Sequence, residues 1–278
     1  MKLINLLPIV SACSLVTEIG PVAQAVSRPS GAIVVGHGQT DVSQVPVTYL
    51  DQARKEFRIW YGHTSHGSQI TSGMWAMNRP PFQFSVDGAN GSLKYVEMAG
   101  DLGTQGNDEW EKATRRYLKN GGDANLVVWS WCGGCSGNTP AGIQRYLALM
   151  DQLEKDFSGR IFVYMTGHLD GSGATGILHR NNEAIRVFCR KNSKVLFDFA
   201  DIESYDSSGK GYLDLQADDG CNYRIDGQQA NWAKDWIAAN PTHGLALPDS
   251  AAHTQPLNAA LKGRAFWWLL ARLAGWAP

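Results

Sequence analysis

Ser65 lies in a short polar turn, residues 62–67, in which His63 and His66 flank it and a glycine stands at either end. A serine hydroxyl becomes a nucleophile only when a base accepts its proton, and acyl transfer also needs hydrogen-bond donors aimed at the developing oxyanion. The turn supplies a hydroxyl and two imidazoles, and its glycines permit a tight backbone. The same composition also fits an ordinary turn between a strand and a helix, with the histidines as surface, capping or orienting residues.

Further polar groups follow four other β-prone runs of the chain. They are Gly100, the loop 132–138, His168 and the acidic segment 200–206. A site in a parallel α/β sheet forms where loops leave the carboxyl ends of the strands, so we expect these groups near Ser65. His168 could bind substrate, substitute as a base or cap a turn. Asp198, Asp201, Glu203 and Asp206 could gather around calcium, although their spacing is not that of a recognised calcium loop.

The elements that must position these groups alternate along the sequence. The β-prone runs cover residues 57–61, 93–98, 126–131, 161–166 and 195–199, and helical patterns cover 108–120, 141–156 and 181–191. Parallel strands need crossover connections, which helices supply in such an alternation. We therefore predict a three-layer α/β/α fold around a central, mostly parallel five-stranded sheet.

Length and charge limit the class of protein. The chain of 278 residues is long enough for one large domain, which we place at residues 49–278 after an irregular lead-in at 26–48. Lys and Arg number 25 against 26 for Asp and Glu, so no basic surplus is available to neutralise a polyanion. We expect a monomer that acts on a neutral or weakly charged molecule, with no nucleic-acid partner.

The N-terminus has the pattern of an export signal: Lys2, an apolar run at 3–10, and then small residues. We predict a signal peptide at residues 1–25, cleaved after Ala25. The alternative is a lipoprotein box in which Cys13 becomes the lipidated first residue. No later stretch approaches the roughly 20 apolar residues that span a bilayer. We therefore expect a secreted or periplasmic protein with no transmembrane segment.

Four cysteines remain after the predicted signal: Cys132, Cys135, Cys189 and Cys221. An even number in an oxidising compartment favours disulfides, whose pairing stays open. The Cys132-Gly-Gly-Cys135 spacing is also typical of a redox pair or half of a zinc site. A closed zinc cage needs a second Cys-x-x-Cys motif or a pair of histidines. Neither occurs in the sequence around Cys189 or Cys221. We therefore expect no metal and no cofactor.

Five segments carry a resemblance to known proteins: GHTSHGSQI (62–70), VVWSWCGG (127–134), FVYMTGHLDG (162–171), FDFADIESYD (197–206) and KGRAFWWLLARLAGW (262–276). From about residue 55 onward, the chain resembles the SGNH/GDSL-type hydrolase superfamily, in particular a divergent group of secreted bacterial SGNH-like proteins. The resemblance implies the flavodoxin-like SGNH hydrolase fold and an esterase-like activity.

The resemblance also implies roles for the residues that match the superfamily's blocks. Ser65 would be the nucleophile and His253, late in the chain, its base. The N–H groups of Ser65 and Gly100 would form the oxyanion hole, and Asp249 would hold the imidazole in the required tautomer.

Three departures from the superfamily pattern bear on these roles. The first motif reads His-Thr-Ser where the superfamily has Gly-Asp-Ser. The loop after the third run has no Gly-x-Asn-Asp, so the third oxyanion donor stays open among Ser136, Asn138 and backbone N–H groups. Asp249 precedes His253 by four residues rather than three.

Two functions are consistent with the sequence. The first is an exported serine esterase that cleaves a small-molecule or polysaccharide ester, such as a carbohydrate acetate, through an acyl-serine intermediate. The second is a non-catalytic exported protein that binds carbohydrate or a cell-wall polymer on an SGNH scaffold, with tryptophan rings on its binding surface. Specificity depends on loop shapes, so the ester itself is not predicted.

Overall fold

The computed structural model describes residues 31–278 apart from residues 104–105. Its centre is a seven-stranded sheet of order β1-β7-β6-β5-β2-β4-β3 in which every pairing is parallel. The strands are β1 (Ile33–Val35), β2 (Arg58–His63), β3 (Phe84–Ser85), β4 (Leu93–Ala99), β5 (Leu126–Trp129), β6 (Ile161–Met165) and β7 (Val195–Phe197). A separate antiparallel hairpin pairs β8 (Asn222–Ile225) with β9 (Gln228–Asn231).

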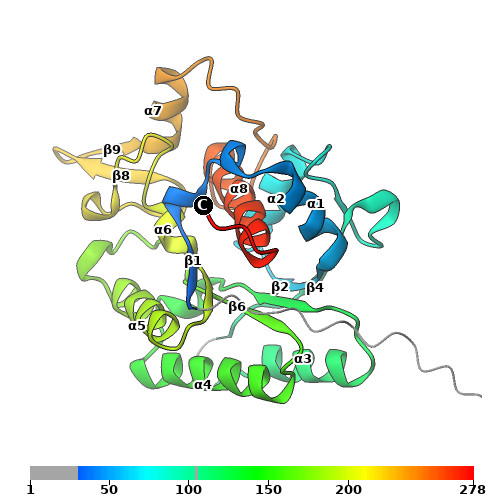
Figure 1. Cartoon of the computed structure of the whole chain (residues 1–278). Helices are drawn as coiled ribbons and strands as arrows, with labels where there is room; N and C mark the ends of the chain where they lie inside the picture. The colour runs from blue at the N-terminus through cyan, green and yellow to red at the C-terminus, as the bar shows by residue number, and fades with distance from the viewer. Residues whose placement is uncertain (1–30, 104–105) are drawn as a thin grey trace, which may run out of the picture.

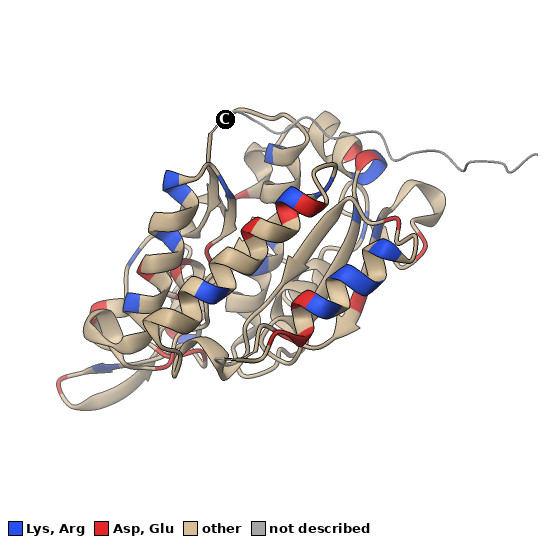
Figure 2. Cartoon of the chain, turned by 90° about the horizontal axis from the view of Figure 1, so that it is seen from below, with Lys and Arg blue, Asp and Glu red and all other residues tan. Residues whose placement is uncertain are grey.

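Helices cover both faces of the sheet (Figure 1). One layer holds α3 (Glu109–Lys119), α4 (Pro140–Asp156) and α5 (Ile177–Lys191), and the other holds α1 (Val47–Glu56), α2 (Ser68–Ala76) and α8 (Pro256–Leu273). The short α6 (Phe199–Glu203) follows β7, and α7 (Trp232–Ala239) follows the hairpin. Figure 2 shows that Lys, Arg, Asp and Glu lie mainly on the outward sides of the helices.

The predicted α/β class is confirmed, and the five expected runs form β2, β4, β5, β6 and β7. The expected strand number was too low because β1 and β3 are edge strands of three and two residues, too short to show a periodic pattern. Within the expected lead-in at 26–48, the described residues include one short strand of the sheet. Ile33–Val35 pairs with β7, which lies about 160 residues further along the chain. No local pattern in the sequence indicates such a long-range pairing.

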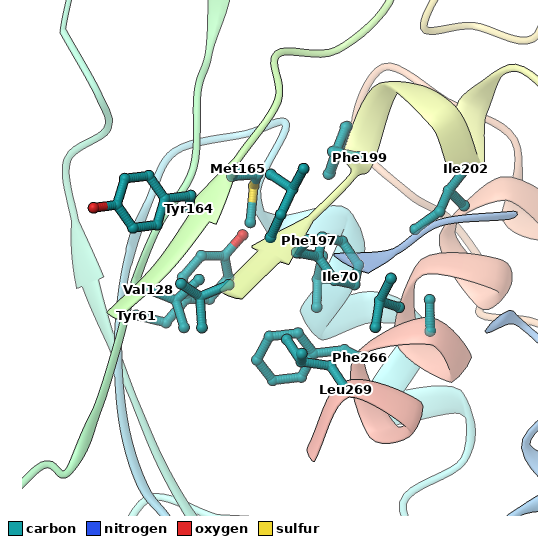
Figure 3. Close-up of a cluster of buried hydrophobic side chains, with 14 of the residues drawn as sticks. Tyr61, Ile70, Val128, Tyr164, Met165, Phe197, Phe199, Ile202, Phe266 and Leu269 are labelled. Atoms are coloured by element: carbon teal, nitrogen blue, oxygen red, sulfur yellow. The ribbon is translucent and has the colours of Figure 1, made fainter. Parts of the chain in front are cut away.

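The core fills the space between the sheet and the helices. Every residue of β5 and β6 is buried, as expected for parallel strands covered on both faces. Apolar side chains of these strands and of β7 meet Phe266 and Leu269 of α8 on one side of the sheet (Figure 3).

The helices α2 and α8 touch backbone to backbone on the face of the sheet opposite to α3, α4 and α5. A Cβ atom placed on Gly263 of α8 would lie 2.3 Å from the carbonyl carbon of Gly73 in α2, and one placed on Gly73 would lie 1.9 Å from the carbonyl oxygen of Ala259. Only glycine permits this approach at both positions. The crossing fixes α8, and therefore the loop that leads into it, relative to the first residues of α2.

The cysteines do not form the expected disulfides. Cys132, Cys135, Cys189 and Cys221 are all free. The Cys135 thiol donates to Asn182 Oδ1 at 3.5 Å, and Cys221 Sγ lies 3.4 Å from Thr254 Oγ1. An even count could not reveal this, because a disulfide requires two cysteine Cα atoms within roughly 7 Å of each other in suitable orientation.

The predicted signal peptide at 1–25 and Cys13 lie outside the described residues. Among the helices that are described, none is long and apolar enough to cross a bilayer.

Candidate active site

Ser65 and His253 meet at the carboxyl edge of the sheet. The strand β2 ends at His63 and α2 begins at Ser68, so Ser65 lies in the turn that joins them. Ser65 Oγ lies within hydrogen-bond distance of His253 Nε2, at 2.9 Å, across 188 residues of sequence. This is the contact that a serine nucleophile makes with its general base.

The turn around Ser65 is held by close backbone packing. A Cβ atom on Gly67 would lie 2.2 Å from Ser130 Oγ and 2.4 Å from His63 Cβ, so no other residue fits there without movement. The Gly67 carbonyl accepts a hydrogen bond from Tyr61 at 3.0 Å, and the Ser65 carbonyl accepts one from Ser68 Oγ at 2.7 Å. These bonds hold the backbone of the turn that carries Ser65.

His253 reaches Ser65 from a loop with an unusual backbone. Its φ of 61° lies in the left-handed region, which non-glycine residues seldom adopt. The preceding carbonyl, of Ala252, accepts a hydrogen bond of 2.7 Å from the side chain of Gln69. The first turn of α2 therefore holds both the nucleophile's turn and the base's loop.

A buried ion pair extends this support. Lys262 of α8 and Glu203 of α6 are fully buried and lie 2.5 Å apart. Lys262 also donates to the Gln69 side chain, and the other Glu203 oxygen accepts the Leu169 N–H at 2.6 Å. One buried cation thus connects the loop of His253 to the loop of His168.

A second set of titratable groups lies against the first. His66 Nε2 is 2.8 Å from Asp219 Oδ2, and His66 Nδ1 is 3.2 Å from Cys132 Sγ. Burial lowers the pKa of His66 below its ordinary value, although Asp219 opposes this shift. Burial works to raise the pKa of Asp219, but the hydrogen bond from His66 and the charges of His168 and His66 outweigh it, and the pKa is lowered.

Three imidazole rings stack at the centre of the site. The His66 ring lies 3.7 Å from that of His168 and 4.4 Å from that of His253, with interplanar angles of 5° and 9°. Ligand-capable atoms of His66, His168 and Asp219 lie within 4.8 Å of one another. The lone pairs of the two parallel rings lie in separate planes and do not converge on one ion, so we assign no metal to this cluster.

Asp249, expected to orient the base, is exposed and makes no hydrogen bond to any described residue. The carboxylate that contacts a histidine of the site is instead Asp219, which bonds to His66 rather than to His253. The sequence analysis missed Asp219 because it lies in a non-repetitive loop before β8. Glu97, which lies 2.6 Å from His63 Nε2, was missed as well.

The Gly100 N–H does not point toward a substrate as expected. It donates to the His63 carbonyl at 3.2 Å and continues the ladder between β2 and β4. The Ser65 N–H, in contrast, has no hydrogen-bond acceptor among the described residues and is free to donate.

The other expected substrate-binding residues do not bond to the Ser65 side chain. Asn138 is buried, and its side-chain oxygen accepts the N–H of Thr139 just before α4. Ser136 makes no side-chain hydrogen bond to a described residue. His168 lies in the site, stacked on His66.

The acidic segment after β7 does not form a calcium cage. Asp198 bonds to Arg186, Asp201 to His37, Glu203 to Lys262 and Asp206 to Tyr212. Each carboxylate already has a protein partner, so the four do not converge on a shared cation.

Comparisons with known proteins add little to this geometry. No protein-family model matches the chain, and no curated protein matches it. Among solved structures, the chain is similar to a proposed acylhydrolase of Bacteroides fragilis at 10% identity, with a TM-score of 0.38, over 72% of this chain and 93% of that one. The functional argument therefore depends on the site itself.

Proposed function

We propose that the protein is a serine hydrolase that cleaves an ester through an acyl-serine intermediate. The observation that carries the proposal is the 2.9 Å contact between Ser65 Oγ and His253 Nε2 at the carboxyl edge of a parallel α/β sheet. The sequence resemblance to SGNH-type hydrolases supports the same assignment.

The proposed reaction has two halves. Ser65 Oγ attacks the ester carbonyl while its proton passes to His253 Nε2, and the imidazolium then gives that proton to the departing alcohol. In the second half, His253 takes a proton from water, the resulting hydroxide attacks the acyl-serine, and Ser65 recovers its proton as the acid leaves. No oxidant, reductant or metal enters the balance.

The oxyanion would be stabilised by the Ser65 N–H, which has no acceptor among the residues that the structure describes. Gly100 is not proposed as a second donor, because its N–H is used within the sheet. A donor aimed at the developing charge typically contributes on the order of 3 kcal/mol to transition-state stabilisation.

The orientation of the base would come from stacking and from its loop. His253 has no carboxylate partner among the described residues, but its ring lies flat against His66, which Asp219 holds in turn. The Asp219 charge behind the stack favours a protonated imidazole during the reaction.

We further propose an exported enzyme that acts on esters of neutral molecules, such as acetylated carbohydrate. The N-terminal export pattern and the balanced charge of the chain support this assignment.

The proposal is tested by hydrolysis of p-nitrophenyl acetate. Ser65→Ala and His253→Ala should each lower kcat/KM by about a thousandfold or more. Ser250→Ala, which changes an exposed serine in the same loop as the base, is the matched control and should retain activity. A wild-type protein without esterase activity toward a panel of acyl esters would favour the binding protein instead.

A further inference from the structure

Cys132 faces the active site from the loop after β5. Its sulfur lies 3.2 Å from His66 Nδ1 and 3.8 Å from Ser65 Oγ. The side chain is partly exposed, whereas the other three cysteines are buried. Burial raises the pKa of the Cys135 thiol to about 12, which makes it inert, in contrast to its partly exposed neighbour Cys132.

The hydrogen-bond pattern makes His66 a base for Cys132. An ionised Asp219 can only accept, so His66 Nε2 must carry the proton of that 2.8 Å bond. A neutral His66 then presents an unprotonated Nδ1 to the thiol, which donates to it. If the proton moves, the same contact joins an imidazolium to a thiolate. In both states, one proton is shared between Sγ and Nδ1.

A second observation points to a ligand-binding position beside Cys132 and His66. His168, stacked on His66, is 9% exposed, and its buried Nε2 atom has no hydrogen-bond partner among the described residues. The carbonyl of Leu169 lies 2.9 Å from Nδ1 and can only accept, so Nδ1 carries the proton. In its neutral form the ring keeps an unused acceptor at Nε2, which suits a ligand with a hydroxyl or an amide N–H.

We propose that Cys132 is a second nucleophile of this site, with His66 as its base and Asp219 as the group that orients His66, and that it accepts acyl groups from thioesters. The contacts run from Cys132 to His66 to Asp219, which is the arrangement of a nucleophile, its base and the carboxylate that orients the base.

The chemical class follows from the exchange reaction. Cys132 Sγ attacks the carbonyl carbon of the thioester, its proton passes to His66 Nδ1, and the departing thiolate takes that proton. One C–S bond forms and one breaks, so the exchange is nearly balanced in energy. An amide-bearing thiol would also supply a donor for His168 Nε2.

The test uses a Ser65→Ala background, which removes the serine route. The protein is incubated with S-acetyl-N-acetylcysteamine, and the adduct is located by intact and peptide mass spectrometry. We expect one acetyl group, on Cys132, and none in the added Cys132→Ser variant. The control Cys135→Ser replaces the buried thiol and should leave the rate unchanged.

A second variant separates a reactive cysteine from one that is merely exposed. His66→Gln can keep the bond to Asp219 but lacks the Nδ1 base, and it should slow acetylation of Cys132 by about a hundredfold. Circular dichroism verifies folding, and Asp219→Asn serves as an independent variant with slowed acetylation. No acetylation of Cys132, or a rate equal to that of free cysteine and unchanged in both variants, would overturn the proposal. Ester hydrolysis by the wild type is measured separately, so failure of the Ser65 assignment would leave this result standing.

Discussion

Replacing Lys262 by methionine removes the cation that connects the loops of His253 and His168. Lys262 and Glu203 are both fully buried, so the substitution leaves a carboxylate without its partner in the interior. Removing one member of a buried ion pair costs about 3–5 kcal/mol. For a chain of this size, each kcal/mol corresponds to roughly 2–4 °C in Tm, so we expect a loss of about 6–20 °C.

The assay is thermal and urea unfolding followed by circular dichroism. Lys94→Met is the matched control, because Lys94 forms an exposed pair with Asp123, for which about 0–1 kcal/mol is expected. Adding Glu203→Gln to Lys262→Met should restore part of the stability, because the uncompensated charge is removed and the amide oxygen still accepts the Leu169 N–H. A Tm for Lys262→Met within 2 °C of the wild type, or a double variant no more stable than the single one, would refute the reasoning.

The remaining predictions concern the helix crossing, the carboxylates and pH. Gly263→Ala should cost about 1–3 kcal/mol or more, measured by urea unfolding, because its methyl group would meet the α2 backbone at 2.3 Å; an unchanged midpoint would contradict the packing argument. Asp219→Asn should lower ester hydrolysis by at least about tenfold and Asp249→Asn by less than about twofold, and the reverse order would reinstate the expected triad. In an NMR titration, His66 should protonate below about pH 6.5, because burial lowers its pKa. The unfolded chain then takes the proton first, so the His66 contribution to stability falls as pH decreases through that value; a midpoint above it would contradict the assignment.

The sequence was informative where a local pattern determines structure. The apolar runs of β5 and β6 are buried on both faces, and the spacing of Ile143, Leu147 and Met150 correctly indicated α4. Short edge strands such as β1 lack such a pattern and depend on a partner far away in sequence.

The site was predicted less completely, since its contacts join distant loops. Ser65 and His253 were named from a superfamily resemblance, and the structure brings them together. Asp219 could not be found by spacing, because it lies 153 residues from the histidine that it contacts. The even number of cysteines and the expected oxidising compartment favoured a disulfide for Cys132, whereas its neighbour in the structure is His66.

The most direct test of the central assignment is covalent labelling by a fluorophosphonate, with the modified residue identified by tandem mass spectrometry. A serine activated by His253 should take up one phosphonyl group per chain, on Ser65, and His253→Ala should abolish the labelling. An adduct on another residue, or no adduct in a wild-type protein that still hydrolyses p-nitrophenyl acetate, would contradict Ser65 as the nucleophile.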